Sequence, residues 1–141
     1  MIGHGIRQAI AEGLTLGVKA GVEAEALWEC VRRGAVGRMS GLHEGIPRMV
    51  FRGQFDPPSF ALALAHKDIS LATELAREYN VPMPVATLAE QIAIQGMVRG
   101  WGNRDSGVTF LLQEEAAGVE VRAPQVDADK SAKFISTHPE I

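Results

Sequence analysis

The sequence is poor in cysteine and in long apolar runs. Cys30 is the single cysteine among 141 residues, which excludes an internal disulfide framework and favours a reducing compartment. No apolar run is long enough to cross a bilayer, and the N-terminus lacks a signal peptide's order of charged region, apolar run and cleavage site. We therefore expect a cytoplasmic protein without a membrane partner.

Neither sign of charge dominates the chain. The 14 basic and 17 acidic residues are evenly mixed and give a formal net charge of −3. A nucleic-acid-binding surface needs clustered lysine and arginine, so we expect no nucleic acid as a partner. Hydrophobic residues make up 46% of the chain, which is enough for the core of one compact domain.

The common nucleotide and metal motifs are also missing. Gly3-His4-Gly5 has no strand before it and no third glycine, so it is not the GxGxxG turn of a dinucleotide-binding fold. No GxxxxGK[ST] loop is present. The histidines are scattered and none has metal-ligand spacing, so we expect no metal site. These histidines are His4, His43, His66 and His138.

For three other residues that could carry chemistry, a packing role is the stronger interpretation. Cys30 shares a helical face with Ala26 and Leu27 and has no obvious activating neighbour, so we expect a small buried hydrophobic residue rather than a nucleophile. Trp28 and Trp101 could each stack on a ligand. We expect instead that Trp28 packs in or between helices and that Trp101 covers a turn.

What the sequence does contain is helical periodicity. Apolar residues recur every three or four positions along six segments, and VEVRA at 119–123 is the one short candidate for a strand. We therefore predict an all-α fold, a single bundle of about six helices over residues 1–117, and a tail at 118–141 that is extended or partly disordered. The predicted helices cover about 2–20, 23–33, 40–50, 65–79, 84–99 and 105–116.

The first helix is predicted to be long and buried, with the bundle built around it. One apolar stripe passes through Ile6 and Leu16, and a second passes through Ile10 and Leu14. A helix that is apolar on two sides is usually buried between neighbours. Gly21 is expected to end this helix. In the fifth helix, the residues expected to face inward are Val85, Leu88, Ile92 and Gly96.

The stretch FDPPSFALALAHKDISLA at 55–72 combines unusual local chemistry with a clear structural transition. Its entry is extended, because residues before proline avoid the α region, and it then becomes an amphipathic helix. Lys67 and Asp68 are expected near the helix start, where free backbone N–H groups and the ammonium could hold a carboxylate or phosphate. The alternative is a solvated lysine beside an aspartate that favours the helix dipole.

Four segments carry a resemblance to a known family. AEGLTLGVKAGV at 11–22, FDPPSFALALAHKDISLA at 55–72, VPMPVATLAE at 81–90 and GWGNRD at 100–105 occur in a characteristic order and spacing. Together they resemble the C-terminal helical domain of the β-hydroxyacid dehydrogenases. This family includes 3-hydroxyisobutyrate dehydrogenase, tartronate semialdehyde reductase and relatives of 6-phosphogluconate dehydrogenase. The resemblance covers roughly residues 1–117.

The resemblance implies cofactor-binding roles for three residues. In the family, the lysine at the position of Lys67 reaches the nicotinamide end of NAD or NADP, and an aromatic residue at the position of Phe60 lines the same region. Asp68 helps to fix this corner. The family's G-x-G-x-x-D turn is matched by Gly100, Gly102 and Asp105.

The same resemblance implies that the chain is not catalytic alone. The family's catalytic lysine and a substrate-binding asparagine align just upstream of Met1, and the Rossmann domain belongs to the other half of such enzymes. We therefore expect no catalytic residue in this chain. NAD or NADP is expected only with a Rossmann domain supplied elsewhere, for which a separate chain is one candidate.

Three functions remain open at this point. The first is the C-terminal domain of an NAD(P)-dependent hydroxyacid dehydrogenase, an oxidoreductase, which closes the substrate cleft and builds the interface of a homodimer or higher homo-oligomer. The second is an autonomous, non-catalytic helical protein that dimerises or binds a partner through an exposed face. The third is a bundle that binds a small acid by itself through Lys67.

Overall fold

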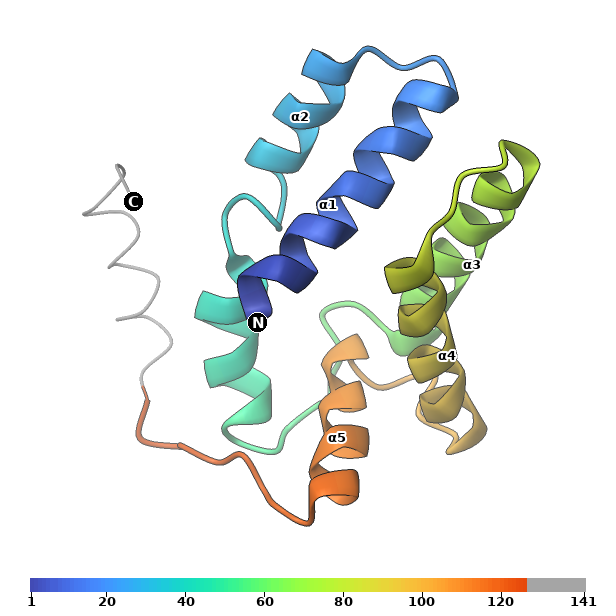
Figure 1. The fold of residues 1–141 in the computed structure, drawn as a ribbon. Helices are drawn as coiled ribbons and strands as arrows, with labels where there is room; N and C mark the ends of the chain where they lie inside the picture. Colours follow the sequence, from blue (N-terminus) through green and yellow to red (C-terminus); the bar gives the residue numbers. More distant parts are fainter. Residues whose placement is uncertain (127–141) are drawn as a thin grey trace.

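The computed structural model describes residues 1–126, which form helices joined by short connections (Figure 1). The predicted all-α class is confirmed for these residues, among which the only β-type pairing is an isolated bridge between Ala61 and Asp105. VEVRA at 119–123 is not a strand. The helices are α1 Ile2–Lys19, α2 Ala24–Arg33, the π-helix η1 Gly41–Val50, α3 Leu62–Glu78, α4 Pro84–Val98, the 3₁₀-helix η2 Ser106–Thr109 and α5 Phe110–Ala117.

Several helix ends follow from the local sequence, including the predicted end of the first helix at Gly21. α1 ends where Gly21 takes a φ of 92°, which costs glycine little, and α3 ends where Asn80 takes a φ of 53°. Pro84 lies in the first turn of α4, where its missing N–H is not needed. Asp105 caps η2, because its side chain accepts a hydrogen bond from Gly107 N at 2.9 Å.

η1 is wound more widely than the short α-helix that the sequence predicts. A hydrogen bond from Phe51 N to Ile46 O, at 3.0 Å, spans five residues at its end. Pro47 lies inside η1, and the wider winding accommodates the proline within the helix. Ser40 does not cap this helix, since its hydroxyl donates to Ala35 O.

The core lies where η1, α3, α4 and η2 meet. The helices α3 and α4 pack against each other. Gly96 permits their close approach, because a Cβ at this position would lie 2.6 Å from Leu62 Cδ2. Trp101, which was predicted to cover a turn, lies after α4 and packs on this core. The buried core residues are Val50, Phe55, Leu62, Ala93 and Val108.

A polar cluster ties α3 to α4 beside this core. Ser70 Oγ and Thr73 Oγ1 donate hydrogen bonds to the Glu90 carboxylate at 2.7 and 3.0 Å. The hydrogen bond from Ser70 is the main cause that lowers the pKa of Glu90, because it favours the charged form. Glu90 therefore stays ionised between the two helices at neutral pH.

α1 lies between α2 and the α3/α4 pair (Figure 1). Within residues 1–126, its buried residues are Glu12 and Leu16, while Ile2 and Val18 are 77% and 49% exposed. The predicted burial of this helix at the centre of the bundle is therefore not found. The physical reason is that α3, α4 and the short helices form the main core among themselves, and α1 packs onto the side of that unit.

Glu12 of α1 caps the N-terminus of α4 and so joins the two helices. Its two carboxylate oxygens accept hydrogen bonds from Val85 N at 2.9 Å and from Ala86 N at 3.0 Å. These are first-turn donors of α4, which has no side-chain cap of its own. Glu12 is 3% exposed, so the carboxylate meets the positive end of the α4 dipole away from water.

The outer face of α4 corrects one prediction. Leu88 and Ile92, which we expected to face inward, are 61% and 37% exposed. The buried side of α4 carries Ala93 and, as predicted, Gly96. Small residues let α4 approach α3 closely, and the larger aliphatic residues then lie on the outside.

α2 corrects two more predictions. Cys30 is exposed and free rather than a buried hydrophobic residue. Trp28 is 52% exposed, and the Arg32 guanidinium lies 5.3 Å from the centre of its ring. α2 packs against α1, so most of its surface remains uncovered within residues 1–126.

The chain after α5 is docked onto the domain. Gly118 ends α5 with a φ of 66°, and Ala123 N then donates to Phe51 O at 3.1 Å. The rest of the predicted tail, residues 127–141, lies outside the described residues. Among residues 1–126, no helix is both long and apolar enough to cross a membrane.

Candidate functional site

The segment 55–63, which precedes and begins α3, is held by the turn at residues 100–107. Asp105 is 3% exposed, and its Oδ2 accepts hydrogen bonds from Ser59 N at 2.8 Å and Phe60 N at 3.3 Å. The backbone of the turn adds two donors: Asp105 N donates to Phe55 O, and Ser106 N donates to Phe60 O, each at 2.9 Å. Both backbone polar groups of Phe60 are therefore paired.

Phe60 is an aromatic side chain on a fixed backbone with its ring partly in solvent. The residue is 44% exposed, whereas Phe55, five residues earlier, is 1% exposed and fills the core. An exposed aromatic side chain on a rigid backbone offers a flat apolar surface at a low cost in conformational entropy. Phe60 thus has the properties of a contact for a planar ligand.

The first turn of α3 does not offer the free N–H groups that the sequence suggested. Leu62 N donates to Arg104 O at 2.8 Å, and Ala63 N donates to Gly102 O at 2.9 Å. The helix begins at Leu62, so Lys67 and Asp68 lie in its second turn rather than at its start. The prediction of an anion site made by Lys67 and the helix start is therefore wrong.

Lys67 and Asp68 form a solvent-exposed ion pair on α3. Lys67 Nζ lies 3.2 Å from Asp68 Oδ1, and their side chains are 62% and 56% exposed. Exposed pairs of this kind contribute little to stability, so the lysine can exchange Asp68 for a ligand oxygen at small cost. Leu64 and Leu71 lie three and four residues away on the same helical face and are also exposed.

The structure places the three predicted residues on α3 and on the segment just before it, but it does not bring them together into a closed pocket. Phe60 lies just before α3, and Lys67 lies on the first half of that helix beside Asp68. The exposed leucines give the lysine an apolar surrounding. This arrangement can receive a planar, partly apolar group that carries an oxygen acceptor, but it contains no paired acid and base for proton transfer.

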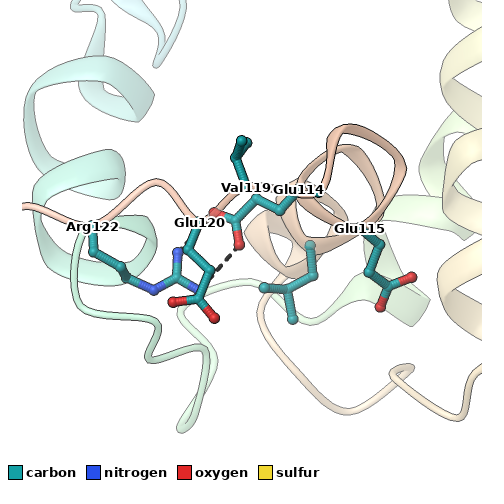
Figure 2. A pocket seen from close by; sticks show the side chains of 7 residues that line it. Glu114, Glu115, Val119, Glu120 and Arg122 are labelled. Atoms are coloured by element: carbon teal, nitrogen blue, oxygen red, sulfur yellow. Dashed lines mark hydrogen bonds and ion pairs between the residues drawn. The ribbon is translucent and has the colours of Figure 1, made fainter.

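The hollow drawn in Figure 2 lies elsewhere, between α5 and the segment that follows it. Arg122 donates to both carboxylate oxygens of Glu114, at 2.7 and 3.0 Å, and Val121 N donates to the same carboxylate at 3.0 Å. Glu114 is 6% exposed. These bonds hold the extended segment against α5, so we assign this hollow a structural role. Within residues 1–126, no three His, Cys, Asp or Glu side chains gather as metal ligands would.

The Glu114–Arg122 pair predicts a pH-dependent contribution to stability. The hydrogen bond from Arg122 is the main cause that holds the pKa of Glu114 below its usual 4.5, although partial burial acts in the opposite direction. A carboxylate with a lowered folded-state pKa stabilises the fold above the unfolded-state value, and this stabilisation is lost as pH falls through the folded-state pKa. Glu114→Gln should therefore lower the urea midpoint at about pH 7, and the difference from the wild type should shrink below about pH 4.5.

Glu120→Gln is the matched control, because Glu120 lines the same hollow and is exposed. It should change the midpoint little at either pH. An equal difference between the wild type and Glu114→Gln at about pH 7 and about pH 3 would contradict the assignment.

Sequence comparison places the chain in a family. Residues 1–113 match the sequence model described as NAD-binding of NADP-dependent 3-hydroxyisobutyrate dehydrogenase. Because the match covers most of the chain, the chain belongs to this family. The match includes Phe60, Lys67, Asp68 and the turn at 100–107 that holds the backbone of Phe60.

Several individual relatives are dehydrogenases or reductases by name. The chain is 34% identical over 117 residues to 2-(hydroxymethyl)glutarate dehydrogenase of Eubacterium barkeri, covering 83% of this chain and 38% of that protein. It is 28% identical over 104 residues to L-threonate dehydrogenase of Cupriavidus necator, covering 74% and 34%. It is 31% identical over 76 residues to 3-sulfolactaldehyde reductase of Escherichia coli, covering 54% and 25%. The chain thus spans less than two fifths of the length of each of these relatives.

Proposed function

We propose that residues 1–117 form the C-terminal helical domain of an NAD(P)-dependent β-hydroxyacid dehydrogenase. The observation that carries this proposal is an exposed ring on a fixed backbone, Phe60, which lies just before the helix α3 that carries exposed Lys67. Phe60, Lys67 and Asp68 are its cofactor-facing residues. The family match and the names of the relatives support the same assignment.

The chemistry of these residues fits a nicotinamide. The ring of Phe60 suits a planar heteroaromatic group, and the ammonium of Lys67 can donate to an amide, hydroxyl or carboxylate oxygen. NAD or NADP supplies hydride transfer with a hydroxyacid when it is held by a Rossmann domain, in the same polypeptide or in a separate chain. In this proposal residues 1–117 close the substrate cleft, and they are not catalytic alone. Free and exposed Cys30 suits a reducing, cytoplasmic setting.

The proposal can be tested with a chimera in which residues 1–117 replace the matching part of 2-(hydroxymethyl)glutarate dehydrogenase. The chimera should reduce a carbonyl substrate with NADH or NADPH. Lys67→Met should then lower kcat/KM by about ten- to a hundredfold, because a charge-assisted hydrogen bond contributes about 1.5–3 kcal/mol. Initial rates against cofactor concentration give the measurement.

Lys19→Met, which removes an exposed lysine near the end of α1, is the matched control and should leave the rate unchanged. An active chimera in which both substitutions have the same effect would exclude the assigned role of Lys67. A folded, cofactor-binding chimera without activity would favour the autonomous, non-catalytic helical protein instead.

We also propose that the chain forms a homodimer or higher oligomer through the face shared by α1 and α2. Many large hydrophobic side chains are exposed in the single chain, among them Ile2, Val18 and Val36. Contiguous exposed apolar surface is typical of protein interfaces. Light scattering at high protein concentration should give at least twice the mass of the 15.2 kDa chain, and a monodisperse monomer would contradict the proposal. An almost wholly apolar hollow of about 280 Å³ on this face is lined by Ile6, Ala9, Ile10, Gly13, Leu14, Val31 and Val36.

A further inference from the structure

We infer that Asp105 is a positioning residue that holds the ring of Phe60 in place for the cofactor. This inference rests on the proposed function, since the ring has a role only if a ligand meets it. Asp105 does not touch the exposed surface itself, because it is 3% exposed. It acts through the backbone N–H groups of the residues that carry and precede the ring.

The two carboxylate oxygens of Asp105 have separate partners. Oδ2 accepts from Ser59 N at 2.8 Å and Phe60 N at 3.3 Å, while Oδ1 accepts from Gly107 N at 2.9 Å. Every one of these contacts requires an acceptor. Asparagine has a single acceptor oxygen, so Asp105→Asn must direct an NH₂ group at Gly107 N or at Ser59 N and Phe60 N. Either repulsive contact displaces the side chain, and the bond from Phe60 N, the longest of the three at 3.3 Å, is the first to be lost.

The loss should be local to Phe60. The backbone bonds from Asp105 N to Phe55 O and from Ser106 N to Phe60 O do not use the aspartate side chain, so the variant keeps them. Lys67 is placed by the α-helix, which begins at Leu62 and is anchored by Arg104 O. Asp105→Asn should therefore loosen Phe60 and leave the geometry of Lys67 unchanged.

The first measurement is the mobility of the Phe60 ring in the full 141-residue chain. The chain has five phenylalanines, so ring signals of ¹³C-labelled phenylalanine can be assigned by comparison with Phe60→Leu. In Asp105→Asn the Phe60 ring should gain motion and lose its distinct chemical shift, whereas the buried Phe55 ring should keep both. A Phe60 ring as ordered as in the wild type would overturn the inference. Equal disorder of the two rings would overturn it as well, since the role would then be generally structural.

The second measurement is the affinity of the chimera for NADPH, and in parallel NADH, determined by isothermal titration calorimetry, which also works in the Phe60→Leu background. Asp105→Asn should weaken binding about tenfold in the wild-type background and cause no further loss in Phe60→Leu, because the two residues act as one unit. Additive losses would overturn the inference. If the chimera without these substitutions binds neither cofactor, that result counts against the proposed function, and the ring mobility still decides whether Asp105 positions Phe60.

Two further variants provide a control and an alternative to Asp105→Asn. Asp56→Asn is the matched control, because this exposed aspartate on the same segment pairs with Arg104 and accepts nothing from Phe60. It should leave the Phe60 ring unchanged. Gly107→Ala is the milder alternative if Asp105→Asn does not fold, because the added Cβ would lie 3.3 Å from Asp105 Oδ1 and displace the carboxylate slightly. It should give a smaller change in the same direction, and an unchanged Phe60 ring in this variant would again overturn the inference.

Discussion

Glu12→Ala should lower the free energy of unfolding by about 2–4 kcal/mol, because it leaves two backbone donors of α4 without their acceptor. Val85 N and Ala86 N are bonded to the Glu12 carboxylate, and the first turn of α4 has no other side-chain cap. The carboxylate also opposes the positive end of the helix dipole. The same substitution removes a direct tie between α1 and the α3/α4 pair.

Equilibrium unfolding in urea, followed by far-UV circular dichroism, measures this effect. Glu12→Gln retains one acceptor oxygen and should give an intermediate loss. Glu74→Ala is the matched control, because Glu74 is exposed in the middle of α3 and should change stability by less than about 0.5 kcal/mol. Equal losses for Glu12→Ala and Glu74→Ala would show that the cap contributes nothing.

Phe55→Ala should be the most destabilising single change that we describe, at about 3–5 kcal/mol. Phe55 is 1% exposed and is the largest fully buried side chain of the main core, where it packs with Val50, Leu62, Ala93 and Val108. Removing a buried phenyl ring loses its transfer free energy and leaves a cavity. The Arg104 guanidinium also lies 5.6 Å from the centre of this ring.

Thermal and urea unfolding measure the loss, and Phe110→Ala is its control. Phe110 is 40% exposed at the start of α5, so its truncation should cost less than about 1.5 kcal/mol. A Phe55→Ala protein with wild-type stability would mean that the ring does not fill the core. If the variant does not fold, Phe55→Leu, which keeps most of the apolar volume, should give a smaller measurable loss.

Local sequence signals predicted the helices better than their packing. The limits of α2 and α4 were predicted to within one residue, because charges, prolines and glycines at helix ends act locally. The burial of α1 was not found, because two apolar stripes show only that the helix has two apolar faces to bury. They do not show whether the side chains that bury these faces belong to the same chain or to another. Leu88 was placed on the wrong side of α4 because the small residues that face α3 carry a weak hydrophobic signal.

The candidate site was predicted in part. The resemblance selected Phe60, Lys67 and Asp68, and the structure shows the first two exposed on a well-held element. The expected start of α3 was wrong because the turn at 100–107 pairs the first N–H groups of the helix, a contact that local sequence cannot reveal. The Glu12 cap was missed because its donors, Val85 N and Ala86 N, lie 73 and 74 positions away in the chain. The local sequence indicated only that Glu12 lies one turn before Leu16, on the buried side of α1.

The hydrogen bonds that hold the backbone of Phe60 have a consequence for the order of folding. The hydrogen bonds from Ser59 and Phe60 to Asp105 join residues 46 and 45 positions apart, whereas α3 and α4 are neighbours in the chain. Closing a long loop costs more entropy than pairing adjacent helices. We therefore expect the α3/α4 hairpin to form first, and the hydrogen bonds to Asp105 to form afterwards. The corner assigned to the cofactor is then completed late in folding, after the elements that support it.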